Sequence, residues 1–166
     1  MTIWKNMSKD ARLLRLGLNV WPPFAGAGIV VEELAADYTY VRVALKATIF
    51  NRNYVGTHFG GSLFAMTDPF FMLMLMRNMG SRYYVWDRSA HIDFVAPGKG
   101  RVVAEMRITP GDLKEMRDGT AAGGKFERDF LTEIIDKNGA VVARVSKRIY
   151  ARLKPEHRPA GENRGS

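Results

Sequence analysis

The sequence predicts one α+β domain in which an antiparallel sheet wraps around a single long helix. Several segments alternate apolar and polar residues, which is the pattern of strands with one buried face. Residues 60–79, in contrast, are apolar on nearly all sides, with almost no charge before Arg77. A helix of that composition has to be buried nearly all round. A sheet that covers one central helix accounts for both patterns.

The predicted strands lie on both sides of this helix. Residues 28–36 form a weaker candidate, and residues 39–49 place Val41, Val43 and Leu45 on one face with Arg42 and Lys46 on the other. Strands are expected again at residues 84–96, 101–108, 125–136 and 140–153, with a short helix or loop at 110–118. Residues 136–139 read Asp-Lys-Asn-Gly, the composition of a hairpin turn.

The main domain, the sheet with its central helix, is expected at residues 25–153. Residues 1–24 are expected to form a short amphipathic helix, capped by Ser8 and ended by Gly17, and a lid-like turn. In that turn, Trp21 and Phe24 either cover a pocket mouth or only pin the helix. Residues 154–166 are polar and are expected to be disordered.

Composition excludes several function classes. The 166 residues contain no cysteine, which excludes a disulfide framework, a thiolate zinc site and a cysteine nucleophile. The longest apolar run, residues 69–76, is about half of a membrane span, and residues 1–10 lack a secretory pattern. We expect a soluble cytoplasmic protein that binds no membrane. The net charge of +8 favours solubility or an anionic ligand. No nucleic-acid-binding motif is present, and no cofactor or metal is expected.

The start of the predicted helix is a candidate site. Gly60 and Gly61 leave backbone N–H groups without a side chain in the way, an arrangement that suits an anion or a polarised carbonyl. Asp68 follows two turns later, on a face shared with Gly61, Ala65 and Met72. A carboxylate buried there without a partner is costly, and such a group is a candidate base or nucleophile.

Pro69 follows Asp68 at once, and the residues allow two interpretations. In the first, Pro69 kinks the helix and frees the carbonyl of Ala65 close to Asp68, which indicates a functional site. In the second, Asp68 caps a second helix that begins at Pro69, and the glycines serve only tight packing.

A family resemblance adds to these observations. Asn53, the Gly60–Gly61 pair and Asp68 have the spacing of the site in the PaaI-like hotdog-fold thioesterases. The motif Gly-Thr-x-Phe-Gly-Gly-x-Leu-Phe-Ala-Met-Thr-Asp-Pro at residues 56–69, and Val-Trp-Asp at residues 85–87, resemble one branch of them. That branch is described as a domain of unknown function or as a tetrameric acyl-CoA thioesterase. The resemblance covers roughly residues 25–153.

The resemblance implies a fold, an assembly and an activity. The fold would be a hotdog, and two subunits would pair into one continuous sheet with two sites at the interface, with dimers pairing into tetramers. Gly61 N–H would polarise the carbonyl of an acyl-CoA, Asp68 would activate water or attack directly, and Asn53 would hold water or substrate.

Further residues are candidates for substrate binding. Gly60, Phe59 and Ser62 lie beside the implied site, and Met72 is a candidate for lining an acyl tunnel. Lys147 and Arg148 are candidates for the phosphates of coenzyme A. For each of these two, the alternative is a strand kept soluble by its charges.

One departure from the family pattern affects the function. The family has histidine directly before Gly-Gly, whereas this chain has Phe59 there and His58 one place earlier. Either His58 substitutes through a backbone shift, or the site works without histidine. Two further functions therefore stay open: a noncatalytic acyl-CoA binding protein, and an enoyl-CoA hydratase or dehydratase with His58 and Asp68 as its acid–base pair.

The strand after the helix carries a polar row. Simple alternation places Asp87, Ser89, His91 and Asp93 on one face, opposite a row of Trp86, Ile92 and Phe94. Such a row could hold zinc, but any polar strand face has the same spacing. We interpret it as a solvated or subunit-facing surface.

Overall fold

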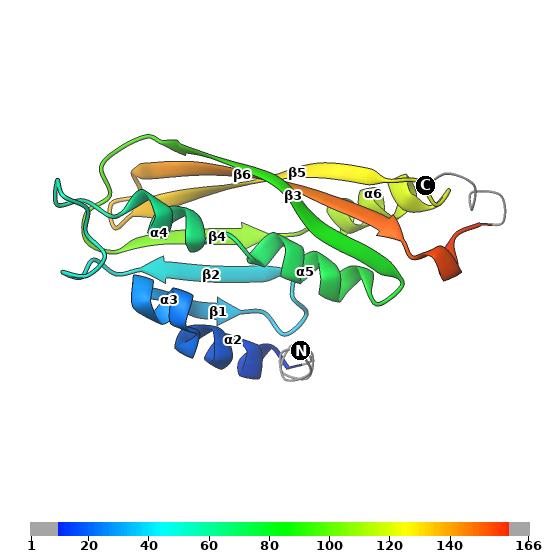
Figure 1. The fold of residues 1–166 in the computed structure, drawn as a ribbon, viewed down its shortest axis with the longest axis horizontal. Helices are drawn as coiled ribbons and strands as arrows, with labels where there is room; N and C mark the ends of the chain where they lie inside the picture. The colour runs from blue at the N-terminus through cyan, green and yellow to red at the C-terminus, as the bar shows by residue number, and fades with distance from the viewer. Residues whose placement is uncertain (1–9, 160–166) are drawn as a thin grey trace.

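A six-stranded antiparallel sheet forms the body of the computed structural model, which describes residues 10–159 (Figure 1). Its strands lie in the order β1-β2-β4-β5-β6-β3. Their bounds are β1 Ile29–Leu34, β2 Tyr40–Leu45, β3 Tyr83–Phe94, β4 Val102–Arg107, β5 Phe126–Asp136 and β6 Val141–Leu153. The predicted α+β class is confirmed, and the expected hairpin at residues 136–139 joins β5 to β6.

The expected central helical segment at residues 60–79 is present and is divided in two, as the second interpretation of Pro69 allowed. Helices α4 (Gly60–Ala65) and α5 (Phe70–Met79) are separated by a turn at residues 66–69. In this turn the N–H of Asp68 donates to the carbonyl of Ala65 at 3.2 Å, so that carbonyl is not free. Pro69 has no N–H to continue the helical pattern. It stands at the N-cap of α5 itself, and no side chain caps that helix.

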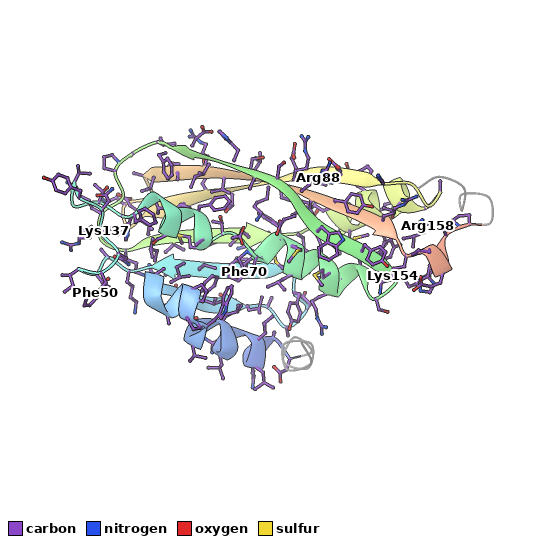
Figure 2. All side chains as sticks on the ribbon, in the orientation of Figure 1. Phe50, Phe70, Arg88, Lys137, Lys154 and Arg158 are labelled. Carbon is purple, nitrogen blue, oxygen red and sulfur yellow. The ribbon has the colours of Figure 1, made fainter. Side chains whose placement is uncertain are left out.

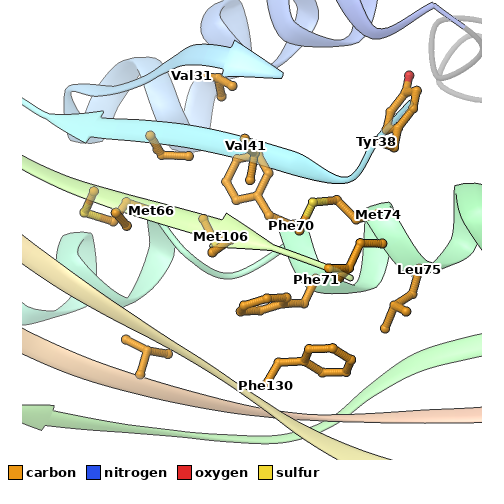
Figure 3. Close-up of a cluster of buried hydrophobic side chains, with 14 of the residues drawn as sticks. Val31, Tyr38, Val41, Met66, Phe70, Phe71, Met74, Leu75, Met106 and Phe130 are labelled. Atoms are coloured by element: carbon orange, nitrogen blue, oxygen red, sulfur yellow. The ribbon is translucent and has the colours of Figure 1, made fainter. Parts of the chain in front are cut away.

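The core lies between the helices and the concave face of the sheet (Figure 3). Phe70, Phe71 and Met74 on α5 are fully buried, and the ring of Phe71 stacks on that of Phe130 on β5 with centroids 5.1 Å apart. Alternation along β6 supplies much of the opposite wall, because every second side chain of this strand points inward. The apolar composition of α5 is thereby explained by burial.

The N-terminal helices lie beside β1 (Figure 1). Helix α2 (Ala11–Val20) begins at Asp10, whose carboxylate accepts from the N–H of Arg12 at 2.8 Å. The predicted cap, Ser8, lies outside the described residues, and Gly17 is buried within the helix instead of ending it. Helix α3 (Pro22–Ala27) buries Phe24 with its ring 5.9 Å from that of Phe70. Phe24 therefore pins α3 to the core.

The two edges of the sheet differ. At the β1 edge, the side chain of Asn19 on α2 accepts from the N–H of Val31 at 2.7 Å and donates to its carbonyl at 3.1 Å. At the opposite edge, β3 pairs on one side with β6 and with no other strand of residues 10–159. Trp86 and Phe94 on β3 are each 59% exposed. One edge is thus covered by a helix, and the other presents a long free strand.

Two short segments complete the fold. Residues 110–118, predicted as a short helix or loop, belong to α6 (Pro110–Thr120), which begins with a capping box between Thr109 and Asp112. The tail expected to be disordered includes a 3-10 helix, η1 (Pro155–His157), while residues 160–166 of it lie outside the described part. No helix within residues 10–159 has the length and apolar character needed to cross a membrane.

Candidate functional site

The loop before α4 is held by Asn53. Its amide nitrogen donates to Thr57 Oγ1 at 2.8 Å and to the carbonyl of His58 at 3.3 Å. Its Oδ1 accepts from the N–H groups of Val55 at 3.1 Å and Thr57 at 3.0 Å. These four bonds use the amide donors and the carbonyl acceptor of the Asn53 side chain without a ligand. Asn53 therefore stabilises the conformation of the loop.

His58 joins this loop to the turn at residues 97–100. The imidazole is only 3% exposed, and its Nε2 lies 2.7 Å from the carbonyl of Gly100. Because a carbonyl only accepts, Nε2 carries the proton and Nδ1 is left as an acceptor. Nδ1 is buried, and no group in residues 10–159 bonds to it. Burial lowers the pKa of His58, against the raising effect of the Gly100 bond.

Aromatic rings cover the two glycines of α4. A Cβ added to Gly61 would lie 2.4 Å from the ring of Phe59, and one added to Gly60 would lie 2.9 Å from that of Phe94. The N–H groups of residues 62 and 63 both donate to the carbonyl of Phe59, whereas those of Gly60 and Gly61 have no backbone acceptor within residues 10–159. The glycines thus serve close packing and leave two N–H donors available.

A hollow of about 410 Å³ opens beside this helix start. Its wall is mostly apolar and includes Val55, Leu63, Phe94 and Pro97, together with Asn53, His58 and Gly60. A second hollow of about 270 Å³ lies on the other side of His58, and its lining includes Arg52 and Lys99. Phe50 lies at one end of the molecule, as Figure 2 shows.

Asp68 is neither buried nor unpaired, which corrects the sequence-based interpretation. Its side chain is 53% exposed, and its Oδ1 accepts from Lys147 Nζ at 2.8 Å. The same ammonium donates to the main-chain carbonyl of Asp68 at 2.7 Å. The shared face predicted for Gly61, Ala65, Asp68 and Met72 requires a continuous helix and is lost at the turn. Asp68 therefore faces outward where α4 ends.

A β-bulge on β3 brings a second carboxylate to Lys147. The pairing of β3 with β6 shifts between Asp87 and Ser89, so the alternation of β3 changes face at Arg88. Asp87 consequently points inward, with its Oδ1 3.1 Å from Lys147 Nζ. The predicted polar row holds for Ser89, His91 and Asp93 but was wrong for Asp87, because it assumed unbroken alternation. Burial raises the pKa of Asp87; the charge of Lys147 lowers it, and that of Asp68 raises it.

The other candidate residues lie as follows. Lys147 is 1% exposed and held by carboxylates, so its ammonium is not open to a phosphate. Arg148 points to the opposite face of β6, where it makes two bonds to Asp129 at 2.7 and 2.8 Å. Ser62 is buried, and Met72 is partly buried against the core. The hydrogen bonds of Lys147 and Arg148 go to Asp68 and Asp129, and not to the glycines at the start of α4.

Sequence reasoning missed the partnership of Asp68, Lys147 and Asp87, although one sign of it was present. The inward row of β6 runs Ala143, Val145, Lys147, Ile149, Ala151 and Leu153, and all of these side chains are buried. A lysine in an otherwise apolar row has to find an acceptor inside the fold. The inward turn of Asp87 depends on the bulge, which leaves no comparable sign.

Comparisons with solved structures identify the fold. A Pseudomonas aeruginosa protein, described as a probable thioesterase of unknown function, is 22% identical with a TM-score of 0.77, covering 86% of this chain and 95% of that one. A Haemophilus influenzae thioesterase is 13% identical, with a TM-score of 0.64 over 89% and 93%. The E. coli PaaI protein of the phenylacetic acid degradation operon is 16% identical, with a TM-score of 0.60 over 91% and 96%.

Sequence comparison adds the family. No curated protein sequence matches this chain. A family model described as "Domain of unknown function (DUF4442)" matches residues 10–151. This range includes the sheet except the last two residues of β6, both helices of the central segment and all the candidate site residues. The chain therefore belongs to the DUF4442 family and has the hotdog fold.

Proposed function

We propose that this protein hydrolyses an acyl-CoA thioester, with Asp68 as its reacting carboxylate. The proposal depends on the hydrogen bonding and the exposure of the Asp68 carboxylate, which lies at the break between α4 and α5. One oxygen, Oδ1, is held by Lys147, while Oδ2 has no hydrogen-bond partner among residues 10–159 and the side chain is half exposed. A fixed carboxylate with one open oxygen suits a general base or a nucleophile.

The reaction needs few groups. If Asp68 acts as a base, it takes a proton from water while the water oxygen bonds to the thioester carbon, and an N–H donor such as that of Gly61 stabilises the resulting oxyanion. The carbon–sulfur bond then breaks, and the thiolate takes up the proton. If Asp68 attacks directly, its oxygen bonds to the thioester carbon, the carbon–sulfur bond breaks with loss of the thiolate, and water then cleaves the resulting mixed anhydride. Asn53 and His58 shape the loop that carries Gly61.

Both groups cannot serve one thioester from the same chain. Gly61 lies in the first turn of α4, whereas Asp68 lies in the turn beyond its end, and the helix between them rises about 1.5 Å per residue. A donor at the oxyanion and a base at the attacking water have to lie within a few ångströms of one carbon. The proposed site therefore combines Gly61 of one copy with Asp68 of another, which makes a homodimer the smallest active unit, and pairs of dimers would give the tetramer.

The free edge of the sheet supports this assembly. Strand β3 has 12 residues, and a long exposed edge with apolar side chains is a template for pairing with another chain. Two copies joined along β3 would form one continuous sheet. Trp86 and Phe94 would then be covered.

The carrier would be held by basic residues near the helix start. Arg52 and Lys99 are both exposed and line the smaller hollow beside His58. Two cations in one place suit the phosphates of coenzyme A. The mostly apolar hollow of about 410 Å³ next to it would take part of the acyl group or pantetheine arm.

The decisive experiment is thiol release from a broad panel of acyl-CoA thioesters. We expect turnover of at least one member by the wild type, and a loss of about 100-fold or more in kcat for Asp68→Asn. Single turnover in ¹⁸O-water tests for the anhydride: label in Asp68 requires that water cleaves an anhydride at the Asp68 carbon, whereas label only in the released acid fits general-base hydrolysis or cleavage at the acyl carbon. No turnover of any member by folded wild-type protein would refute hydrolysis.

A noncatalytic acyl-CoA binding protein is the second candidate. The position of Phe59 favours it, because its ring lies over Gly61 where a thioester carbonyl would approach. Saturable binding by calorimetry without turnover would select this function. A hydratase or dehydratase finds less support, since His58 is buried and bonded to Gly100; absorbance at the conjugated double bond of an enoyl-CoA tests it.

A further inference from the structure

Lys147 is a charged residue in a row of apolar ones. It stands on β6 between Val145 and Ile149, which also point inward, and its side chain is 1% exposed. Removing an ammonium from water costs several kcal/mol unless acceptors inside the fold replace the lost hydration. The burial of Lys147 therefore indicates that its ammonium has a specific role in the fold or the site.

The acceptors around Lys147 match its donors in number. Its Nζ lies 2.8 Å from Asp68 Oδ1, 2.7 Å from the main-chain carbonyl of Asp68 and 3.1 Å from Asp87 Oδ1. An ammonium has three N–H donors and no acceptor, so its donors are all used. The ring of Phe64, on α4, lies 5.8 Å from Nζ and closes one further side.

Two of the three contacts go to one residue, and they bind both its side chain and its main chain. Asp68 stands in the turn between α4 and α5 and is followed by Pro69, which has no N–H to donate. A half-exposed carboxylate in such a turn would otherwise sample several side-chain rotamers. Contact at Oδ1 and at the carbonyl fixes its orientation and leaves Oδ2 directed away from Lys147.

Asp87 holds Lys147 from the other side. It reaches the ammonium only because the bulge at Arg88 turns it inward. Asp68 and Asp87 are the charged groups that contact Lys147 within residues 10–159. With one cation between two carboxylates, the cluster keeps a net negative charge, so the ammonium is shared and does not cancel Asp68.

We propose that Lys147 is a positioning residue for Asp68, and that Asp87 in turn orients Lys147, so that Asp68 Oδ2 is presented to substrate as the reacting oxygen. This inference rests on the proposed thioesterase function. Lys147 is too deeply buried to touch substrate, and its effect passes through Asp68. A misplacement of about 1 Å in a reacting group can cost roughly 100-fold in rate.

The test compares four variants on a thioester that the wild type hydrolyses. Lys147→Met keeps the length of the side chain without its charge, and Lys147→Arg keeps the charge. Asp87→Asn removes the second carboxylate. Lys114→Met is the matched control, because Lys114 is an exposed lysine of α6 paired with Asp118.

We expect Lys147→Met to lower kcat by roughly 100-fold with KM changed by less than about threefold. Lys147→Arg should recover part of the rate, and Lys114→Met should match the wild type. The acid limb of the pH–rate profile should move to higher pH in Lys147→Met, where two carboxylates face each other without a cation, and to lower pH in Asp87→Asn, where the ammonium serves Asp68 alone.

A purely structural role of Lys147 would not displace the acid limb in opposite directions in Lys147→Met and Asp87→Asn. Unchanged limbs, or a loss of kcat that follows only the folded fraction, would overturn the inference. If Lys147→Met does not fold, the displacement in Asp87→Asn decides. If the wild type hydrolyses no thioester, the proposed function fails, and ¹³C titration of the Asp87 carboxyl replaces the rate. Because the charge of Asp68 raises the pKa of Asp87, the midpoint should fall in Asp68→Asn, and an unchanged midpoint would refute the coupling of the three groups.

Discussion

At the start of α4 the polar side chains bind the loop to which they belong, whereas at the break between α4 and α5 they come from three distant segments. Asn53 makes its four bonds within residues 53–58, and His58 bonds to the neighbouring turn at Gly100. Asp68, Asp87 and Lys147 instead meet from the turn, β3 and β6. The first region uses neutral hydrogen bonds, and the second concentrates charge.

This difference teaches where substitutions should cost most. A neutral hydrogen bond contributes about 0.5–1.5 kcal/mol net, while removing one partner from a buried ion pair costs about 3–5 kcal/mol. Substitutions at the break between α4 and α5 should therefore lower the free energy of unfolding more than substitutions at the start of α4. The start of α4 should tolerate substitution better, because each of its hydrogen bonds is local.

The largest effect is expected for Lys147→Met. It leaves two carboxylates facing an uncharged side chain, and because Asp68 is half exposed the cost should be about 2–3 kcal/mol, below that of a fully buried pair. Urea unfolding at pH 7 measures it. The exposed control Lys114→Met should change the free energy of unfolding by less than about 0.5 kcal/mol. Equal costs for both variants would remove the contrast between the regions.

His58→Gln should have the next largest effect, about 1–2 kcal/mol by the same measurement. Glutamine can still donate to the carbonyl of Gly100, but it fills the buried space less well. A cost above that of Lys147→Met would reverse the proposed order of the two regions.

Gly61→Ala should lower stability by about 1 kcal/mol, because the added Cβ meets the ring of Phe59. In a Phe59→Ala background the same change should become neutral or stabilising, since alanine favours a helix over glycine by up to about 1 kcal/mol. Thermal unfolding of the single and double variants measures the change of sign. An identical cost in both backgrounds would show that the ring is not the obstacle.

The smallest effect should appear in the pH dependence of stability. The pKa of His58 lies below its ordinary value of 6.5 in the folded protein, chiefly because of burial. The unfolded chain therefore takes up the proton first, so the stability that neutral His58 contributes is present above pH 6.5 and is lost as the pH falls. The difference in urea midpoint between wild type and His58→Gln should shrink from pH 7.5 to pH 5.5. A difference that grows would mean that protonated His58 is favoured in the fold.

The same contrast separates what could be predicted from what could not. The glycine pair, the loop and the α+β class follow from local patterns, and strand positions such as 125–136 agree with β5 to within one residue. The prediction of a buried and unpaired Asp68 was wrong, because its partner Lys147 lies 79 residues further along the chain. Contacts of that separation depend on sheet register, and a single bulge at Arg88 changes which face Asp87 occupies.

The covered edge of β1 has a consequence for how copies of this chain can associate. Asn19 occupies the hydrogen-bonding groups of Val31 that a further strand would need. Within residues 10–159, β3 is the edge left open to a further strand, so two copies that join along β3 would have a helix-covered β1 at each outer side. Growth by strand addition would then end at a closed pair, and the helix that precedes β1 would oppose the formation of fibres.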